Sequence, residues 1–338
     1  MDADDALRLL RSMLRIRRFE ERLIQLHREG LFPGHYHVYI GQEATALAVC
    51  SALTHGDLIF STWRNHGHLL ARGADPKRMM AEILGRAGGY CGGKAGTLHL
   101  AAKELGIPAT SALVGGNIPL AVGAALGLKY RRTGGIVVAF FGDGALEEGA
   151  FYEGILLAAL WKVPTLLVCE NNSVPPHLRA PGQYPSSVHP ARQLVDVPSS
   201  FSIAAEVVDG TDLEELMPFM EKQVRAVRGG EPRFVEVRTT RWPGSVPLWP
   251  ELVGGETELG WAFGERPASE EYAEWVEQSD PVIRFLRRSS EKGLVTREQA
   301  ETVDREVRSE IEEAVQFALA SPFPEADAAF AGVFARGC

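Results

Sequence analysis

An apolar run followed by Gly142-Asp143-Gly144 offers the clearest chemistry in this sequence of 338 residues. Parallel strands deliver their loops to one edge of a sheet, and ligands collect at that edge. The first turn of a helix that follows such a loop presents free N–H groups and a partial positive charge. Glycines let the backbone approach a ligand closely. A strand, a Gly-Asp-Gly turn and a helix in this order predict a phosphate-binding loop.

A dinucleotide site is the competing interpretation of the same loop. Gly142-x-Gly144-x-x-Glu147, with Glu170 at the end of the next strand, imitates the glycine fingerprint of nicotinamide-dependent dehydrogenases. However, Glu147 stands where the third glycine belongs, and Asp143 would place a carboxylate beside a pyrophosphate. Because that repulsion is costly in a partly dry site, we expect a cation between the two anions.

Magnesium is the cation that this pattern favours, since it takes six oxygen ligands, commonly one or two of them from protein side chains. Asp143 offers one carboxylate, and the next predicted strand ends in Glu170-Asn171-Asn172. Neighbouring parallel strands end side by side, so a carbonyl oxygen of Asn172 is expected to reach the same ion. A Gly-Asp-Gly turn or an Asn pair alone is an ordinary turn signal. Joined by strand, helix and strand, they predict a magnesium and phosphate site.

The elements that must position these groups are readable around them. Residues 136–141 form a continuous apolar run, as expected for a strand buried on both faces. Residues 147–161 read as a helix, and residues 165–169 as a second buried strand. This order predicts a parallel sheet with a right-handed crossover. The expected fold class is α/β, a doubly wound and mostly parallel sheet with helices on both faces.

The rest of the chain continues the alternation of helices and strands. Hydrophobic periodicity and end signals predict further helices at 5–29, 42–53, 76–84, 115–129 and 213–227, strands at 58–62, 203–208 and 233–239, and irregular loops at 173–200 and 242–256. Residues 269–323 read as helical. We therefore expect an α/β domain at 1–268 that carries the site. A helical extension at 269–338 would pack on that domain or on a partner.

Composition excludes several classes of function. The formal net charge of −9 and the pI of about 5.6 argue against a general affinity for nucleic acid. No apolar run is long enough to span a membrane, and the acidic N-terminus lacks the order of a signal peptide. The cysteines form no CxxC pair and fit a reducing cytoplasm better than a disulfide framework or a zinc site; they are Cys50, Cys91, Cys169 and Cys338.

One charged stretch near the N-terminus needs a separate interpretation. Its arginines alternate with apolar residues and two glutamates follow, which predicts the solvated face of a helix rather than a phosphate-binding patch. The residues concerned are Arg11, Arg15, Arg17, Arg18, Glu20 and Glu21.

The segment from Gly142 to Asn172 resembles the thiamine diphosphate motif, which begins with Gly-Asp-Gly and ends in Asn-Asn. More closely, the sequence resembles the α subunit of the E1 component of 2-oxoacid dehydrogenases, a family that includes pyruvate, branched-chain and acetoin dehydrogenases. The resemblance runs from about Arg15 to Glu170 and returns near Arg233 to Thr240. It rests on further pieces in the right order, namely Ile40-Gly41-Gln42-Glu43-Ala44, Arg64-Asn65-His66-Gly67, Gly93-Lys94-Ala95-Gly96-Thr97-Leu98-His99 and Ala158-Ala159-Leu160-Trp161-Lys162-Val163-Pro164.

The resemblance implies a thiamine diphosphate-binding fold with Mg²⁺ and assigns its ligands. Asp143 and Asn172 match the family's magnesium ligands, with the backbone carbonyl of Val174 in third place. Arg64 matches the arginine that meets the diphosphate, where a fork of donors suits phosphate oxygens. Trp63 stands where many members have tyrosine. The remaining cofactor positions are Val114, whose backbone would touch the aminopyrimidine, and Gly142, Gly144 and Ala145, which form the loop against the diphosphate.

The resemblance also points to histidines. His37 and His66 match active-site positions where imidazoles line the substrate side and can relay protons at neutral pH, and His99 is assigned likewise. For each of the three, a hydrogen-bonded structural histidine is the alternative.

In the family, the carboxylate that activates the cofactor belongs to a separate β subunit, and the cofactor is bound between α and β. The resemblance therefore implies an α subunit of an α2β2 enzyme in the cytoplasm. Such an enzyme decarboxylates a 2-oxo acid and passes the acyl or hydroxyalkyl unit to an acceptor. That acceptor is a lipoyl-bearing E2 component or another acyl carrier.

Two loops depart from the family's pattern. The family commonly has Tyr-Arg-Tyr-His-Gly-His-Ser after its late strand. This chain has Thr240-Arg241-Trp242-Pro243-Gly244-Ser245-Val246, so Pro243 and Ser245 replace both histidines. After Asn172 the chain reads Ser173-Val174-Pro175-Pro176 in place of a loop with Tyr and Gly. Because these loops flank the cofactor and substrate channel, the departures favour transfer to an acceptor other than a lipoyl domain.

Three other functions stay open at this stage. They are a non-oxidative carboligase or acyltransferase, a non-catalytic assembly partner that keeps the fold, and a nicotinamide-dependent dehydrogenase. Retention of Asp143, Asn172 and Arg64 together argues against the non-catalytic partner.

Overall fold

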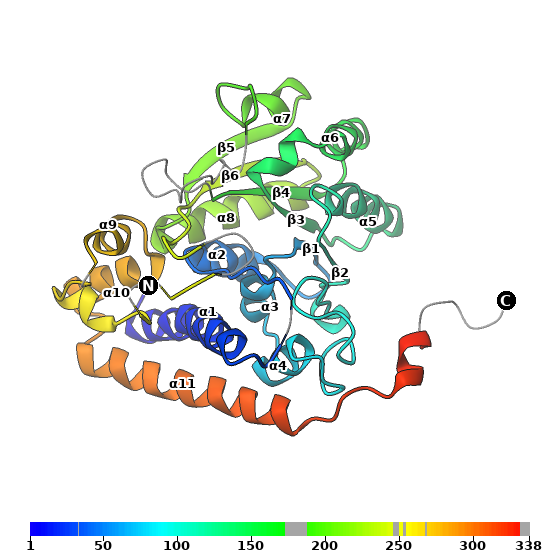
Figure 1. Ribbon diagram of the computed structural model, residues 1–338. Coiled ribbons are helices and arrows are strands. Elements are labelled where there is room, and N and C mark those ends of the chain that lie inside the picture. The colour runs from blue at the N-terminus through cyan, green and yellow to red at the C-terminus, as the bar shows by residue number, and fades with distance from the viewer. Residues whose placement is uncertain (33, 173–187, 246–249, 253–254, 268, 332–338) are drawn as a thin grey trace.

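A parallel β-sheet forms the centre of the computed structural model (Figure 1), which describes residues 1–32, 34–172, 188–245, 250–252, 255–267 and 269–331. Within these residues the strands pair in the order β2-β1-β3-β4-β6-β5, and every pair is parallel. The strands are β1 Leu58–Thr62, β2 Ala109–Ser111, β3 Val137–Gly142, β4 Thr165–Asn171, β5 Ala204–Asp209 and β6 Arg233–Arg238. The predicted α/β fold class is confirmed.

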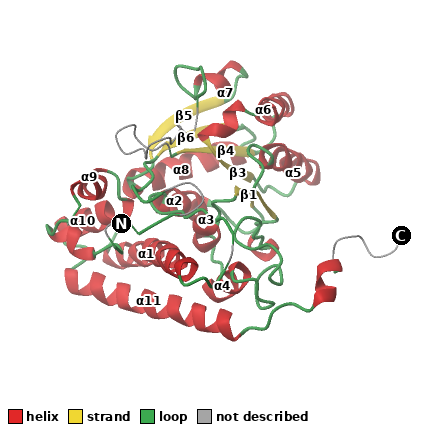
Figure 2. Ribbon diagram, viewed as in Figure 1, coloured by secondary structure: helices red, strands yellow, loops and turns green. Residues whose placement is uncertain are grey.

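The sheet is buried on both faces because its strands carry apolar side chains at successive positions. In β3, Val138 and Phe140 join one hydrophobic core, while Val137, Ala139 and Phe141 join the other. Alternate side chains of a strand point to opposite faces, so this apolar run supplies both cores at once. Helices cover each face, as Figures 1 and 2 show.

The first core lies between the sheet and a layer of helices from both ends of the chain. These are α1 Ala3–Arg28, α2 Glu43–Ala52, α3 His66–Ala71, α4 Pro76–Ile83, α8 Leu213–Arg228, α10 Pro281–Glu291 and α11 Arg297–Ala320, with α9 Glu270–Gln278 beside them. The second core lies under α5 Asn117–Arg131, α6 Gly149–Trp161 and the short α7 Asp196–Ser200. Single turns of 3-10 helix complete the list: η1 Lys103–Leu105, η2 Asp143–Glu147, η4 Leu259–Phe263 and η5 Ala326–Phe330.

Most predicted elements are confirmed to within a few residues, and four differences stand out. The first turn after β3 is the 3-10 helix η2, and the α-helix predicted from residue 147 begins only at Gly149. The short strand β2 and the helix α3 were not predicted, and α7 lies inside the segment predicted to be an irregular loop. Strands and helices this short leave little periodicity in a sequence.

The prediction for the charged N-terminal stretch is wrong for its second half. Arg17, Arg18, Glu20 and Glu21 are at most 3% exposed, because α1 lies between the sheet side of the domain and α11. Arg17 donates to Glu43 Oε1 at 2.7 Å and, with both terminal nitrogens, to the two carboxylate oxygens of Asp280 at 2.8 and 2.9 Å. Buried charges require partners of this kind. They were invisible in the sequence, since Asp280 lies 263 positions away.

The C-terminal helices belong to the first core rather than standing apart. Residues of α10 and α11, such as Phe285 and Val307, are buried in the same hydrophobic cluster as Leu10 of α1. Residue 268, the predicted domain boundary, lies outside the described residues, so that boundary stays a prediction. Of the cysteines, Cys50, Cys91 and Cys169 are free thiols. In the described ranges, no helix combines the length and apolarity that a bilayer crossing requires.

Candidate functional site

A cavity of about 330 Å³ lies where the carboxyl ends of β1, β3, β4 and β6 meet. It gathers most of the residues predicted for the site, although they come from loops far apart in the chain. The predicted residues that line it are His37, Trp63, Arg64, Val114, Gly142, Asp143, Gly144, Ala145 and Asn172. Thr62, Leu113, Gly115, Phe141, Glu147, Glu148, Glu170, Arg241 and Ser245 complete its wall.

Asp143 and Asn172 are brought together by strand register. Gly142, the last residue of β3, pairs with Glu170 of β4, so the residues that follow each strand lie at the same edge. Asp143 is 1% exposed and Asn172 is 8% exposed. The Asn172 Nδ2 atom donates to Gln42 Oε1 at 2.6 Å, which leaves the amide oxygen as the group available to a cation. The third predicted ligand, the carbonyl of Val174, lies outside the described residues.

No cluster of three or more His, Cys, Asp or Glu side chains suited to a metal is found in the part of the chain that the structure describes. The magnesium site predicted here does not need such a cluster, because it uses one carboxylate, one amide and main-chain or phosphate oxygens. Magnesium commonly keeps few protein ligands.

Two arginines contribute positive charge to the cavity. Arg64 is 8% exposed and donates to the main-chain carbonyl of Val38. Burial lowers its pKa to about 10, and the nearby Arg241 charge acts in the same direction. Burial also lowers the pKa of Arg241, while the charge of Asp143 opposes this. Both arginines share the cavity wall with the carboxylates of Asp143, Glu147, Glu148 and Glu170, so an anion bound beside the arginines needs a cation beside the carboxylates.

The buried carboxylate Glu170 lines the cavity and also contacts side chains of the protein interior. It accepts a hydrogen bond from the Tyr39 hydroxyl and lies 3.4 Å from His68 Nε2. The His68 ring stacks on Phe140 and reaches Ser61 Oγ at 2.8 Å through Nδ1. His68 therefore has a structural role that spacing alone did not reveal.

The three predicted histidines fall in different environments. His37 lines the cavity beside Trp63, at 5.8 Å between ring centroids. His66 is buried away from it, with Nδ1 3.0 Å from Glu20 and Nε2 2.7 Å from Thr97 Oγ1, which is the structural alternative raised above. His99 is exposed and does not line the cavity. The geometry thus supports an active-site position for His37 alone, and catalytic roles for His66 and His99 stay predictions that it does not support.

The prediction that an α-helix begins directly at the phosphate-binding loop is wrong. Gly142-Asp143-Gly144 opens η2, a five-residue 3-10 helix, whereas α6 begins at Gly149 after Glu148. So short a turn has almost no macrodipole, since the dipole grows from aligned peptide units along a helix. Positive charge in the cavity therefore comes from Arg64 and Arg241, not from a helix end.

His37 provides a test of this electrostatic description. Burial, followed by the charges of Arg64 and Arg241, lowers its pKa to about 3. In the unfolded chain the imidazole titrates near 6.5. As pH falls below that value, the unfolded chain binds a proton that the folded chain does not, so stability decreases. We expect the loss attributable to His37 to reach about 2 kcal/mol at pH 5.

The measurement is the free energy of unfolding of the ligand-free chain at pH 7 and pH 5. His37→Gln should reduce the difference between the two values, and His99→Gln, at an exposed position, should leave it unchanged. Equal pH dependence in His37→Gln and the unsubstituted chain would show that His37 is not held neutral.

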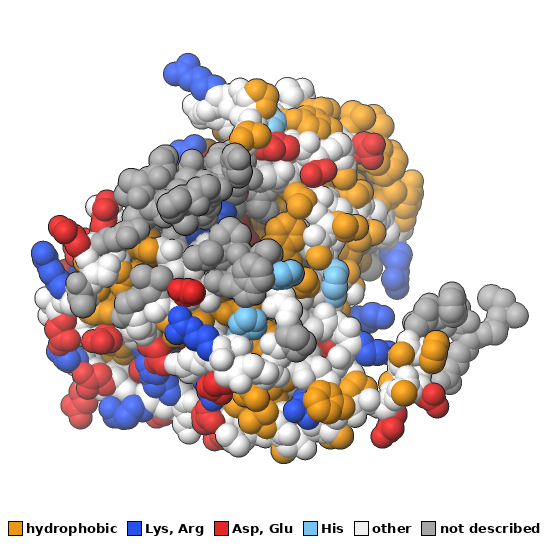
Figure 3. All heavy atoms as spheres, in the orientation of Figure 1, with side chains coloured by type: hydrophobic (Ala, Val, Ile, Leu, Met, Phe, Trp, Pro, Cys, Tyr) orange, Lys and Arg blue, Asp and Glu red, His pale blue; other side chains and the backbone are white. Residues whose placement is uncertain are grey.

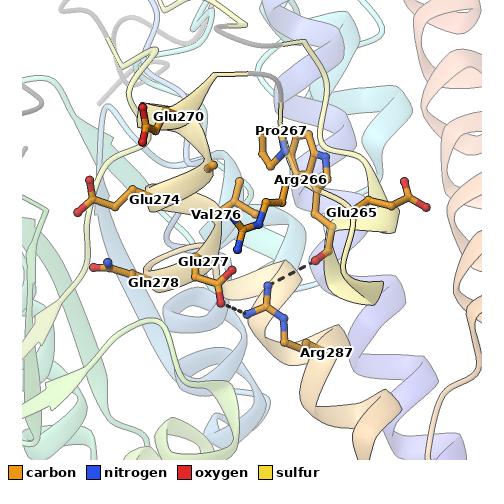
Figure 4. Close-up of a pocket in the computed structure, with 11 residues that line it drawn as sticks. Glu265, Arg266, Pro267, Glu270, Glu274, Val276, Glu277, Gln278 and Arg287 are labelled. Carbon is orange, nitrogen blue, oxygen red and sulfur yellow. Dashed lines mark hydrogen bonds and ion pairs between the residues drawn. The ribbon is translucent and has the colours of Figure 1, made fainter.

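A larger cavity, of about 460 Å³, lies between η4, α9 and α10 (Figure 4). Its wall is rich in glutamates, including Glu270 and Glu277. Arg287 approaches Glu277 at 3.5 Å and the carbonyl of Trp261 at 3.4 Å, so its charge is already engaged. None of the residues predicted for the site lines this cavity, and we assign no ligand to it.

Four charged residues of the first cavity were not predicted as site members, namely Glu147, Glu148, Glu170 and Arg241. For Glu170 and Arg241 the sequence carried a signal. Glu170 lies near the end of β4, two residues before Asn172, and Arg241 follows β6, the neighbour of β4 in the sheet. A residue just after a neighbouring parallel strand is expected at the same edge.

The chain is similar to known proteins over most of its length. The Dehydrogenase E1 component family matches residues 11–245 and 266–327. The α subunit of acetoin:2,6-dichlorophenolindophenol oxidoreductase from Bacillus subtilis is 35% identical over 95% of this chain and 91% of its own length. Its counterpart from Cupriavidus necator is 36% identical over 96% and 92%, and the pyruvate dehydrogenase E1 component subunit alpha of Zymomonas mobilis is 35% identical over 96% and 86%. The chain belongs to the dehydrogenase E1 component family.

Proposed function

We propose that this chain is the α subunit of a thiamine diphosphate-dependent enzyme that cleaves the bond beside the carbonyl of a small 2-oxo acid or 2-hydroxy ketone and transfers the resulting unit to an acceptor. The observation that carries the proposal is the meeting of Asp143, Asn172 and Arg64 in one cavity of a chain that belongs to the E1 family. The relatives are named as acetoin and pyruvate oxidoreductase subunits, which supports oxidative transfer over the other functions left open.

The residues present fit a magnesium diphosphate. Asp143 and the Asn172 amide are oxygen donors of the kind that Mg²⁺ takes. Arg64 and Arg241 supply cations whose pKa values are lowered by burial. An ideal Cβ added at Gly142 meets no atom within 4 Å, so open space lies next to the loop backbone. This donor set combines a metal-binding pair with anion-binding groups, as a metal–phosphate pair requires.

When bound, thiamine diphosphate supplies the carbon that accepts the electron pair released as the substrate bond breaks. The residues of this chain bind and orient. Asp143 and Asn172 would hold the metal, and Arg64 would contact the diphosphate. His37 is neutral at pH 7, so it can donate or accept a hydrogen bond on the substrate side. An anion placed beside Arg64 and Arg241 offsets their charge, which raises the pKa of His37 toward the range useful for proton transfer.

The carboxylate that activates the cofactor is proposed to lie on a β subunit. An apolar surface next to the cavity supports such a partner (Figure 3). Leu113 and Val114 line the cavity mouth and are 75% and 41% exposed. The surface continues over α5 and α6 through Leu120, Tyr130, Leu156, Leu160 and Trp161, which are between 38% and 79% exposed. Contiguous apolar surface of this kind marks a protein interface.

This interface yields a prediction. Leu160→Glu places a charge on the apolar surface, at a residue that is 69% exposed. The chain should fold normally but lose assembly with its partner, by about 10-fold or more in affinity. Val207→Glu changes an apolar residue on β5 that is 37% exposed and lies outside this surface, and this variant should assemble normally. Analytical ultracentrifugation of the co-expressed chains measures both. Normal assembly of Leu160→Glu would place the interface elsewhere.

The function is tested by co-purifying the chain with its β-like partner and measuring turnover of pyruvate, branched-chain 2-oxo acids and acetoin. Oxidised dye and a lipoyl domain are supplied as separate acceptors. We expect turnover that requires both chains, thiamine diphosphate and Mg²⁺. Turnover with dye but not with the lipoyl domain would agree with the loss of the histidines at Pro243 and Ser245. No turnover of any substrate, with cofactor and metal bound, would overturn the proposal.

A further inference from the structure

Arg241 lies at the cavity on a segment that the fold holds firmly. The segment follows β6, and its first residue, Thr239, donates from N to the Asn171 carbonyl at 2.9 Å. The Trp275 indole donates to the carbonyl of Thr240, also at 2.9 Å. On the other side of Arg241, Trp242 is 1% exposed and packs edge-on against Tyr272. Arg241 is thus anchored on both sides, and its side chain reaches the cavity from a preorganised backbone.

Arg241 contacts one of the predicted magnesium ligands. Its Nε donates to the main-chain carbonyl of Asn172 at 2.7 Å. The side chain of the same asparagine is fixed from another direction by Gln42, at 2.6 Å. Asn172 directly precedes residues that the structure does not describe. These two hydrogen bonds therefore determine where the Asn172 amide oxygen lies at the end of β4.

In the part of the chain that the structure describes, the terminal nitrogens of Arg241 make no hydrogen bond or ion pair. Within the described residues, neither Arg241 nor Arg64 forms an ion pair, although both line the same cavity. The charge of Asp143 acts on Arg241 and opposes the lowering of its pKa by burial. Two half-buried or buried guanidiniums facing one space repel each other unless an anion lies between them. Their fork of donors suits phosphate oxygens.

We propose that Arg241 is a positioning residue for the metal and diphosphate site: its Nε fixes Asn172, and its terminal nitrogens supply a second cation, opposite Arg64, to the diphosphate. This inference rests on the proposed function and extends it to a residue on the loop where the family's histidines are missing. That loop keeps a cation in Arg241, although Pro243 and Ser245 carry no charge.

Two substitutions separate the two parts of this role. Arg241→Met removes both the hydrogen bond and the charge. Arg241→Lys keeps the charge and removes the planar fork that donates from Nε. Arg225→Met is the control, because Arg225 is exposed on α8 and far from the cavity wall. The assembled complex is titrated calorimetrically with thiamine diphosphate at saturating Mg²⁺, and separately with Mg²⁺ at fixed thiamine diphosphate.

For Arg241→Met we expect a loss of about 10- to 100-fold in affinity for thiamine diphosphate, the range for charge-assisted hydrogen bonds. Arg241→Lys should recover much of that affinity at saturating Mg²⁺ but still need about tenfold more Mg²⁺, since outer-shell contacts to a metal ligand have effects of this size. If Arg241 had only a structural role, Arg241→Lys would change the affinity for thiamine diphosphate and the requirement for Mg²⁺ together.

Three outcomes would overturn the inference. One is unchanged titrations for Arg241→Met in a complex whose unsubstituted form binds the cofactor, which would leave the proposed function intact. Another is an unchanged requirement for Mg²⁺ in Arg241→Lys. This result would show that Arg241 does not position Asn172, even if Arg241→Met fails to assemble. The last is absence of magnesium-dependent binding by the unsubstituted complex, which would overturn the proposed function as well.

Discussion

Replacing Asp143 by alanine is expected to weaken magnesium-dependent binding of thiamine diphosphate by at least about 100-fold. Asp143 is the carboxylate at the turn between β3 and η2, 1% exposed and lining the cavity with Asn172. Outer-shell partners of a metal ligand already contribute about 10- to 100-fold to metal affinity, so a direct ligand should lie at or above the top of that range. Calorimetric titration of the assembled complex gives the affinity.

Glu221→Ala serves as the control, because Glu221 is an exposed acid on α8 that does not line the cavity. It should bind the cofactor like the unsubstituted complex. If Asp143→Ala bound it equally well, Asp143 would not be a metal ligand, and a non-catalytic chain that keeps only the fold would become the better interpretation.

Replacing Arg17 by methionine is expected to lower the free energy of unfolding by about 3–5 kcal/mol, the range for breaking a buried ion pair from one side. Arg17 is fully buried and joins α1 to Glu43 at the start of α2, to Asp280 before α10, and to Thr257. Methionine fills much of the volume, but it leaves two buried carboxylates without their shared cation. Denaturant unfolding of the chain measures the change.

Arg11→Met is the matched control on the same helix. Arg11 pairs with Glu306 of α11, but the two side chains are 38% and 53% exposed. Pairs in water contribute about 1 kcal/mol or less, so this variant should stay close to the unsubstituted chain. An Arg17→Met variant as stable as Arg11→Met would mean that α1 is held by its apolar face alone.

The sheet could be predicted from the sequence because the apolar composition of its central strands indicates that they are buried. Apolar runs such as residues 136–141 have one stable placement, between two layers of helices. Because neighbouring parallel strands end side by side, Asp143 and Asn172 could also be predicted to lie together. Short elements such as β2 and α3 escaped prediction, because three to six residues are fixed by their neighbours rather than by their own pattern.

Contacts between distant parts of the chain were the harder problem. The partners of Arg17 lie on α2 and before α10, and nothing near Arg17 in the sequence points to them. The position of His66 was also hard to predict from the sequence. Its place beside Arg64 in the sequence suggested the active site, but the turn into α3 directs it to Glu20 and Thr97 in the interior. Spacing cannot distinguish these two directions when the helix that decides between them is itself unpredicted.

The site was partly predictable for a similar reason. Residues that directly follow a strand are located by the sheet, which is why the loop after β3 and the end of β4 were assigned correctly to one edge. Arg241 follows β6, whose position beside β4 was not known from the sequence. The order β4-β6-β5 reverses the chain order at this edge of the sheet, and only the structure shows it.

The most direct test of the central claim is a calorimetric titration of the assembled protein with thiamine diphosphate, in Mg²⁺ and again in the presence of a chelator. A parallel titration uses NAD. The account predicts one thiamine diphosphate site for each α chain, with binding lost when the metal is removed and no binding of NAD. Binding that persists without a divalent metal, or binding of NAD in place of thiamine diphosphate, would contradict it.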